Sequence, residues 1–237
     1  TTPAQIMAAA TVNIPAIGLN SGPMLNGWFE GERTGSGTIV WKARELMAAG
    51  KIDYQQFLKL VASSAPSTGH CNTMGTASTM NSLAEALGMT LPGASSIPAP
   101  DANHPRMSAA CARRIVEMVW EDLTPAKLLT QNHFQNAITV AMAMGCSTNA
   151  IIHLVAMSRR AGPACAISLN DFDAASRKVP VIANIRPSGS TYLMEDFYYA
   201  GGMRALMKNL ADGQLLHSDA MTVNGQTVAQ NLADAQV

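Results

Sequence analysis

Two short apolar runs, separated by a long series of helical patterns, constrain the fold of this chain most. Residues 14–20 and 178–185 are short and apolar, and each ends at a turn signal, Ser21-Gly22-Pro23 in the first case and Pro187 with Gly189 in the second. This length and punctuation favour buried strands. Strands separated by helices are typical of α/β proteins. The sequence therefore predicts an α/β fold, in which a parallel sheet is flanked by helices.

The helices are marked by caps and by apolar stripes. Asp53 and Gln56 form a capping-box pattern at the start of one helix, and Gly88 ends another. Gly145 ends a third, and Ser147 can cap the next one. Apolar residues at helical spacing predict further helices within residues 80–87, 112–119, 134–141 and 195–210.

The end of the chain changes character. Asn224-Gly225 lies between two short apolar stretches and predicts a β-hairpin within residues 221–228. We therefore expect residues 1–215 to form the α/β domain. Residues 216–237 are expected to lead into a β-rich domain that this chain does not contain.

Composition narrows the class of protein. Of the 237 residues 48% are hydrophobic and 14% charged, and the formal net charge is zero, which favours a globular enzyme over a disordered or nucleic-acid-binding chain. No apolar run is long enough to predict a membrane span. The four cysteines form no CxxC pair, which favours a reducing, cytoplasmic compartment.

The segment 69–80 carries the clearest chemistry. Cys71 lies in a loop of small and hydroxyl-bearing residues just before an expected helix, and the positive end of a helix favours the thiolate that binds metals. Gly69 and Gly75 would let a bulky inorganic group approach the backbone. From the residues alone, Cys71 is either a metal ligand or a small buried apolar side chain.

This segment resembles the cluster motif of the dihydroxy-acid and sugar-acid dehydratase family. Residues 27–32 and 35–38 resemble the pentonate branch of that family, the xylonate and arabinonate dehydratases. Further segments agree with the family in order and spacing: Thr2-Pro3-Ala4, Gly22-Pro23-Met24, Ser64-Ala65-Pro66, residues 84–88, and Ser147-Thr148-Asn149-Ala150 with His153.

The resemblance implies a hydro-lyase that removes water from an aldonate to give a 2-keto-3-deoxy acid. It also implies a [2Fe–2S] cluster with Cys71 as one ligand, magnesium, and a homodimer or homotetramer. Family members are more than twice as long and carry a Cys-Asp-Lys triplet just before the Thr-Thr-Pro seen here at residues 1–3. We therefore expect the chain to be a segment, with the other ligands and a serine base outside it.

The substrate and even the class of protein stay open at this point. A pentonate such as D-xylonate or L-arabinonate is the leading substrate. One alternative is the branched-chain 2,3-dihydroxy acid of amino-acid biosynthesis. A different class of protein, a non-catalytic α/β binding module, would leave Cys71 as a packed thiol. No nucleic-acid or membrane partner is expected.

Other candidate residues carry weaker signals. Ser147, Thr148 and Asn149 are candidates for the substrate pocket, although Ser147 is equally a helix cap. His70, Thr73 and Thr76 are candidates for tuning the cluster from beside it. His153 is interpreted as a core histidine, and the remaining cysteines as structural: Cys111, Cys146 and Cys165, of which Cys146 is the nearest rival to Cys71.

Overall fold

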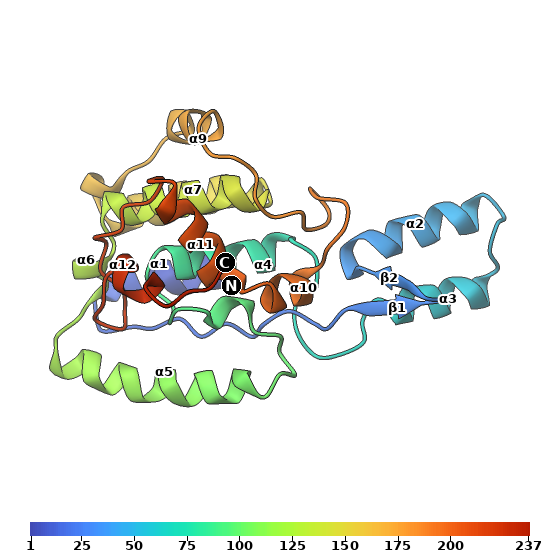
Figure 1. Cartoon of the computed structure of the whole chain (residues 1–237), viewed down its shortest axis with the longest axis horizontal. Helices are drawn as coiled ribbons and strands as arrows, with labels where there is room; N and C mark the ends of the chain where they lie inside the picture. Colours follow the sequence, from blue (N-terminus) through green and yellow to red (C-terminus); the bar gives the residue numbers. More distant parts are fainter.

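The computed structural model describes residues 1–237 and is mostly helical (Figure 1). None of its helices combines the length and the apolar character that crossing a bilayer requires. In chain order the elements are α1 (Thr2–Val12), β1 (Gly27–Phe29), β2 (Glu32–Thr34), α2 (Ser36–Ala48), α3 (Tyr54–Ser63), α4 (Thr76–Ala86), η1 (Ala94–Ser96), α5 (Asn103–Trp120), α6 (Pro125–Leu128), α7 (Gln131–Met144), α8 (Asn149–Ala161), η2 (Pro163–Cys165), α9 (Leu169–Ser176), α10 (Met194–Tyr199), α11 (Gly202–Asp212) and α12 (Val228–Leu232).

Helices α4 and α7 form the centre of the body. They pack on each other, α1 and α8 cover α4, and α9 and α11 contact α7. Every residue from 78 to 86 is buried, and most of this stretch of α4 is small or apolar. Its one carboxylate, Glu85, accepts hydrogen bonds from Gly93 and Ser95. Phe134 on α7 is completely buried, and residues 220–232 pack Val223 and Val228 into the same core. The body therefore has a helical core rather than a sheet.

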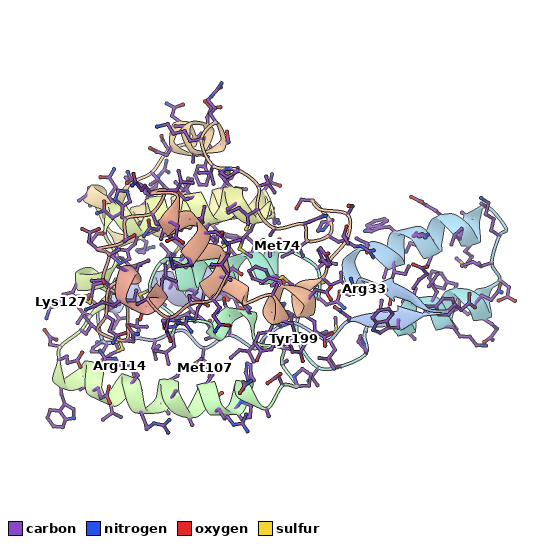
Figure 2. The ribbon with its side chains drawn as sticks, viewed as in Figure 1. Arg33, Met74, Met107, Arg114, Lys127 and Tyr199 are labelled. Carbon is purple, nitrogen blue, oxygen red and sulfur yellow. The ribbon has the colours of Figure 1, made fainter.

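Residues 27–63 form a separate arm that extends away from the body (Figure 1). In the arm, β1 and β2 form an antiparallel hairpin, and α2 and α3 pack mainly on each other. The arm is tied to the body at its inner end, where Arg33 lies (Figure 2). There the Arg33 guanidinium pairs with Asp196 at 3.2 Å, and Arg186 donates to the Arg33 carbonyl at 3.1 Å.

The prediction of a parallel sheet is wrong. The hairpin β1–β2 is the only sheet, and residues 14–20 and 178–185 are irregular, with single parallel bridges at Gly18–Thr90 and Ile185–Tyr192. A strand needs a continuous neighbour for its backbone hydrogen bonds, and no neighbouring segment runs beside either stretch for more than one residue. Apolar runs of this length cannot reveal whether such a neighbour exists.

Two smaller predictions also need correction. The helix expected over residues 195–210 is split into α10 and α11, because Gly201 and Gly202 adopt positive φ angles of 98° and 61° that interrupt helical geometry. The Asn224-Gly225 turn forms, with Gly225 at φ 79°, but only a single antiparallel bridge precedes α12, so there is no two-stranded hairpin. That residues 216–237 connect to a β-rich domain outside this chain stays a prediction.

The predictions from helix caps are confirmed for three helices, whereas the cap predicted at Ser147 is displaced by one residue. Asp53 and Gln56 form the reciprocal capping box of α3, with the Gln56 amide 2.7 Å from the Asp53 carboxylate. Gly145 ends α7 in the left-handed conformation, and Gly88 has a φ of 71° just after α4. Helix α8 begins at Asn149, one residue later than a cap at Ser147 would place it.

Candidate functional site

The sulfur of Cys71 lies against the start of α2, at the base of the arm. The Ser36 hydroxyl is 3.0 Å from Cys71 Sγ. A Cβ atom added to Gly37 would lie 3.9 Å from the same sulfur and only 2.8 Å from the Thr73 hydroxyl. Glycine at position 37 therefore lets the α2 backbone approach the Cys71–Thr73 loop closely. The arm, 35 residues upstream, completes the surroundings of Cys71.

Asn72 holds the loop and the arm together. Its side chain is completely buried, and its Oδ1 accepts a hydrogen bond from the Ser36 backbone amide at 2.8 Å and lies 3.0 Å from the Ser36 hydroxyl. Its Nδ2 donates to the Leu25 carbonyl at 2.8 Å, and its own carbonyl accepts from the Met194 amide at 2.8 Å. Through its side chain and its backbone carbonyl, Asn72 therefore joins three segments that are distant in sequence.

His70 contacts the backbone of Cys71 rather than its sulfur. Its Nδ1 is 3.0 Å from the Cys71 carbonyl, which can only accept, so Nδ1 carries the proton in this contact. Its Nε2 is buried without a hydrogen-bond partner. Burial lowers the pKa of His70, while the bond to the Cys71 carbonyl opposes that change. The neutral ring therefore presents an unprotonated Nε2.

A second polar cluster joins the starts of α4 and α8. Asn149 Nδ2 donates to the Thr76 hydroxyl at 2.8 Å, and that hydroxyl is 3.2 Å from the Ser147 hydroxyl. The Ser147 hydroxyl also accepts from the Asn149 amide at 3.3 Å. The structure thus brings Thr76, Ser147 and Asn149 together. Thr148 is exposed at the N-cap of α8, and its side chain makes no capping hydrogen bond.

A cavity of about 440 Å³ lies beside this cluster. Thr76 and His70 line it, together with Asn81 from α4 and His153 from α8. The interpretation of His153 as a core residue is therefore wrong: its side chain is half-buried and borders open space. No aspartate, glutamate, lysine or arginine lines the cavity, so its surface offers hydroxyl, amide and imidazole groups.

The setting of Cys71 fits one ligand of an iron–sulfur cluster. The side chain is half-exposed, a hydroxyl faces its sulfur, and an added Cβ at nearby Gly75 would meet no atom within 4 Å. No group of three or more His, Cys, Asp or Glu side chains gathers anywhere in residues 1–237. Because clusters are held by several ligands, this chain offers one of the set. Magnesium prefers carboxylate oxygens, and the cavity lining contains none.

The other cysteines lie elsewhere. Cys111 and Cys165 are buried in the core, and burial raises the pKa of both thiols. Cys146 packs against the core, and burial raises its pKa to about 12. A thiol with so high a pKa is protonated at neutral pH and is a poor metal ligand. These environments suit the structural role that the sequence predicts for all three.

Sequence reasoning missed Ser36 and Asn72 as parts of the site. Both belong to segments that drew attention, residues 35–38 and 69–80, but neither carries a local signal for contact with a cysteine. Their roles depend on how the arm folds back onto the loop. The only sign of this contact in the sequence is that hydroxyl and amide residues lie beside glycine in both segments.

Comparison with known proteins identifies the family. The family model for the dihydroxy-acid/6-phosphogluconate dehydratase N-terminal region matches residues 1–231. The chain is 50% identical to D-xylonate dehydratase of Caulobacter vibrioides over 232 residues, covering 98% of this chain and 38% of that protein. It is 50% identical to L-arabinonate dehydratase of Rhizobium leguminosarum bv. trifolii over 234 residues, covering 99% and 40%.

A more distant relative is the dihydroxy-acid dehydratase of Caldanaerobacter subterraneus subsp. tengcongensis, 40% identical over 235 residues, with 99% of this chain and 42% of that protein covered. The chain thus spans about two-fifths of the length of these relatives. Because the family model covers nearly all of its residues, the chain belongs to the dihydroxy-acid/6-phosphogluconate dehydratase family, whose N-terminal region it represents.

Proposed function

We propose that this chain is part of a hydro-lyase that converts a pentonate, such as D-xylonate or L-arabinonate, into a 2-keto-3-deoxy acid and water. The observation that carries the proposal is the match along 98–99% of the chain, at 50% identity, to proteins named for those two activities. Proteins named dihydroxy-acid dehydratase match at 40–42% identity. The difference in identity favours a sugar acid over the branched-chain dihydroxy acid.

Cys71 supplies one ligand to a [2Fe–2S] cluster in this proposal. When bound, such a cluster would supply Lewis-acid chemistry for the loss of the substrate hydroxyl. The contribution of this chain is to hold the sulfur of Cys71 in place through Ser36 and Asn72. The cavity lining contains no carboxylate that would hold magnesium.

The cavity binds the hydroxylated part of the substrate. Thr76, Asn81 and His153 present a hydroxyl, an amide and an imidazole, which can each exchange hydrogen bonds with sugar hydroxyls. His70 also lines the cavity, and its unprotonated Nε2 has no hydrogen-bond partner, so it is an acceptor available to a substrate hydroxyl. A branched-chain acid would leave most of these groups unpaired, which costs binding free energy.

The test combines an activity assay with iron and sulfide analysis of the full-length protein, prepared without oxygen. D-xylonate, L-arabinonate, D-gluconate and 2,3-dihydroxyisovalerate are offered in turn, and the 2-keto acid product is measured. Activity on a pentonate, at least about tenfold above that on the branched-chain acid, supports the proposal. Activity confined to the branched-chain acid contradicts the choice of substrate.

Two cysteine variants separate catalysis from packing. Cys71→Ser is expected to lose the cluster and the activity, whereas Cys111→Ser, a change at a buried core thiol, is expected to keep both. A colourless wild-type protein without iron would instead support a non-catalytic binding module, in which Cys71 is only a packed thiol.

A further inference from the structure

We propose that Ser36 is a positioning residue for the cluster, whose hydroxyl donates a hydrogen bond to the ligand sulfur of Cys71. The inference rests on the proposed function, because it takes Cys71 to be a ligand. It goes further by assigning a role to the arm: the first residue of α2 reaches back to the body and sets the properties of that sulfur.

Two acceptors lie equally close to the Ser36 hydroxyl, and the charge on a ligand sulfur favours Cys71 as the partner. The Asn72 amide donates to Ser36 Oγ at 3.2 Å, so this contact does not use the hydroxyl proton. Asn72 Oδ1 lies 3.0 Å from the hydroxyl, but it is an uncharged acceptor that also takes the Ser36 backbone amide at 2.8 Å. Cys71 Sγ, also at 3.0 Å, has no other donor, and a metal-bound sulfur carries negative charge and no proton. The charge-assisted bond to sulfur is therefore the stronger choice.

The position of Ser36 is held from two sides. The Ser36 backbone amide donates to the side chain of the completely buried Asn72. Ser36 is also the first residue of α2, whose backbone approaches the loop at Gly37. Around the inner end of the arm, Arg33 pairs with Asp196 and fixes β2 against the body. Because none of these contacts involves the Cys71 side chain, they place the hydroxyl at the sulfur before any cluster binds.

A hydrogen bond to a ligand sulfur withdraws electron density from it and favours the reduced cluster. Reduction potentials of iron–sulfur clusters depend on such bonds, and losing a supporting partner of a ligand commonly weakens metal binding about tenfold or more. Removing the Ser36 hydroxyl is therefore expected to shift the midpoint potential of the cluster to more negative values. It is also expected to speed loss of iron to a chelator by about tenfold.

The experiment compares four forms of the full-length protein, prepared without oxygen: wild type, Ser36→Ala, Ser36→Thr and Ser63→Ala. Ser36→Thr keeps the hydroxyl. Ser63 is the matched control, since it also lies in the arm but its hydroxyl donates to the Leu60 carbonyl at 2.7 Å and does not contact Cys71. Midpoint potential, visible spectrum and the rate of iron loss to a chelator are measured in each.

The expected result is a shifted potential and faster iron loss in Ser36→Ala alone, with wild-type behaviour largely restored in Ser36→Thr. If Ser36→Ala holds a cluster with the wild-type potential and the wild-type rate of iron loss, the inference is overturned while the proposed function stands. If the wild-type protein holds no iron, the proposed function fails and takes this inference with it.

Discussion

Replacing Asn72 with alanine should loosen the arm from the body without unfolding the core. The change removes the acceptor of the Ser36 backbone amide, which donates to Asn72 Oδ1 at 2.8 Å. It also removes the donor of the Leu25 carbonyl, which accepts from Asn72 Nδ2 at 2.8 Å. A buried polar group left unpaired costs about 1–3 kcal/mol. Ser36 and Leu25 are only half-buried, so water can reach both groups in part, and we expect a total of about 2–4 kcal/mol for the two.

This free energy should appear as local opening at the base of the arm. Because 1.4 kcal/mol corresponds to a factor of ten, amide hydrogen exchange at Ser36 should accelerate roughly 30- to 700-fold. Peptide-level exchange followed by mass spectrometry measures this rate, while amides of α7 in the core report on global stability. Asn209→Ala is the control, since its side chain bonds only to the Ala205 carbonyl one turn earlier on α11. Exchange at Ser36 that stays within a factor of about three of wild type would refute this account of Asn72.

Three further changes test the body of the molecule. Phe134→Ala should lower the free energy of unfolding by about 3–5 kcal/mol, because the ring is completely buried, whereas Leu169→Ala at an exposed site should have almost no effect in the same denaturant titration. Burial lowers the folded-state pKa of His133, so the unfolded state binds more protons. The contribution of His133 to stability should therefore be fully present above about pH 6.5 and fall as the pH drops below that value. His133→Gln should remove this part of the pH dependence in denaturant titrations at several pH values. Cys146, with a pKa of about 12, should react with iodoacetamide at neutral pH at least about 100-fold more slowly in the folded protein than in urea; equal rates would show that its burial is not maintained in solution.

Local signals predicted local structure well in this chain. The capping box at Asp53 and the left-handed glycine at Gly145 are determined by residues within one turn, and both are confirmed. The parallel sheet failed because a strand is defined by its neighbour, and neither apolar run has a continuous neighbour among residues 1–237. Apolar character alone does not distinguish a paired strand from an extended segment.

The residues of the candidate site show the same difference between local signals and contacts with distant segments. Thr76, Ser147 and Asn149 could be named from their motifs, and the structure brings them together because α4 and α8 begin side by side. Ser36 could not be named, since its contact with Cys71 depends on an arm that folds back across 35 residues of sequence. His153 was misjudged because its helix has an apolar side, and only the packing of α1 against α8 shows which residues border the cavity.

The arm leaves the body and returns to it at one place. The Met24 amide donates to the His70 carbonyl at 2.9 Å, the His70 amide donates to the Gly22 carbonyl at 3.0 Å, and Ser67 Oγ accepts from the Leu25 amide at 3.0 Å. A segment closed so tightly at its root can be lengthened, shortened or fused to a reporter at its exposed far turn, residues 49–51, with little strain on the core. Changes in length are therefore expected to be tolerated at this turn. They are not expected to be tolerated where the arm joins the body, because there they would move Ser36 away from the sulfur.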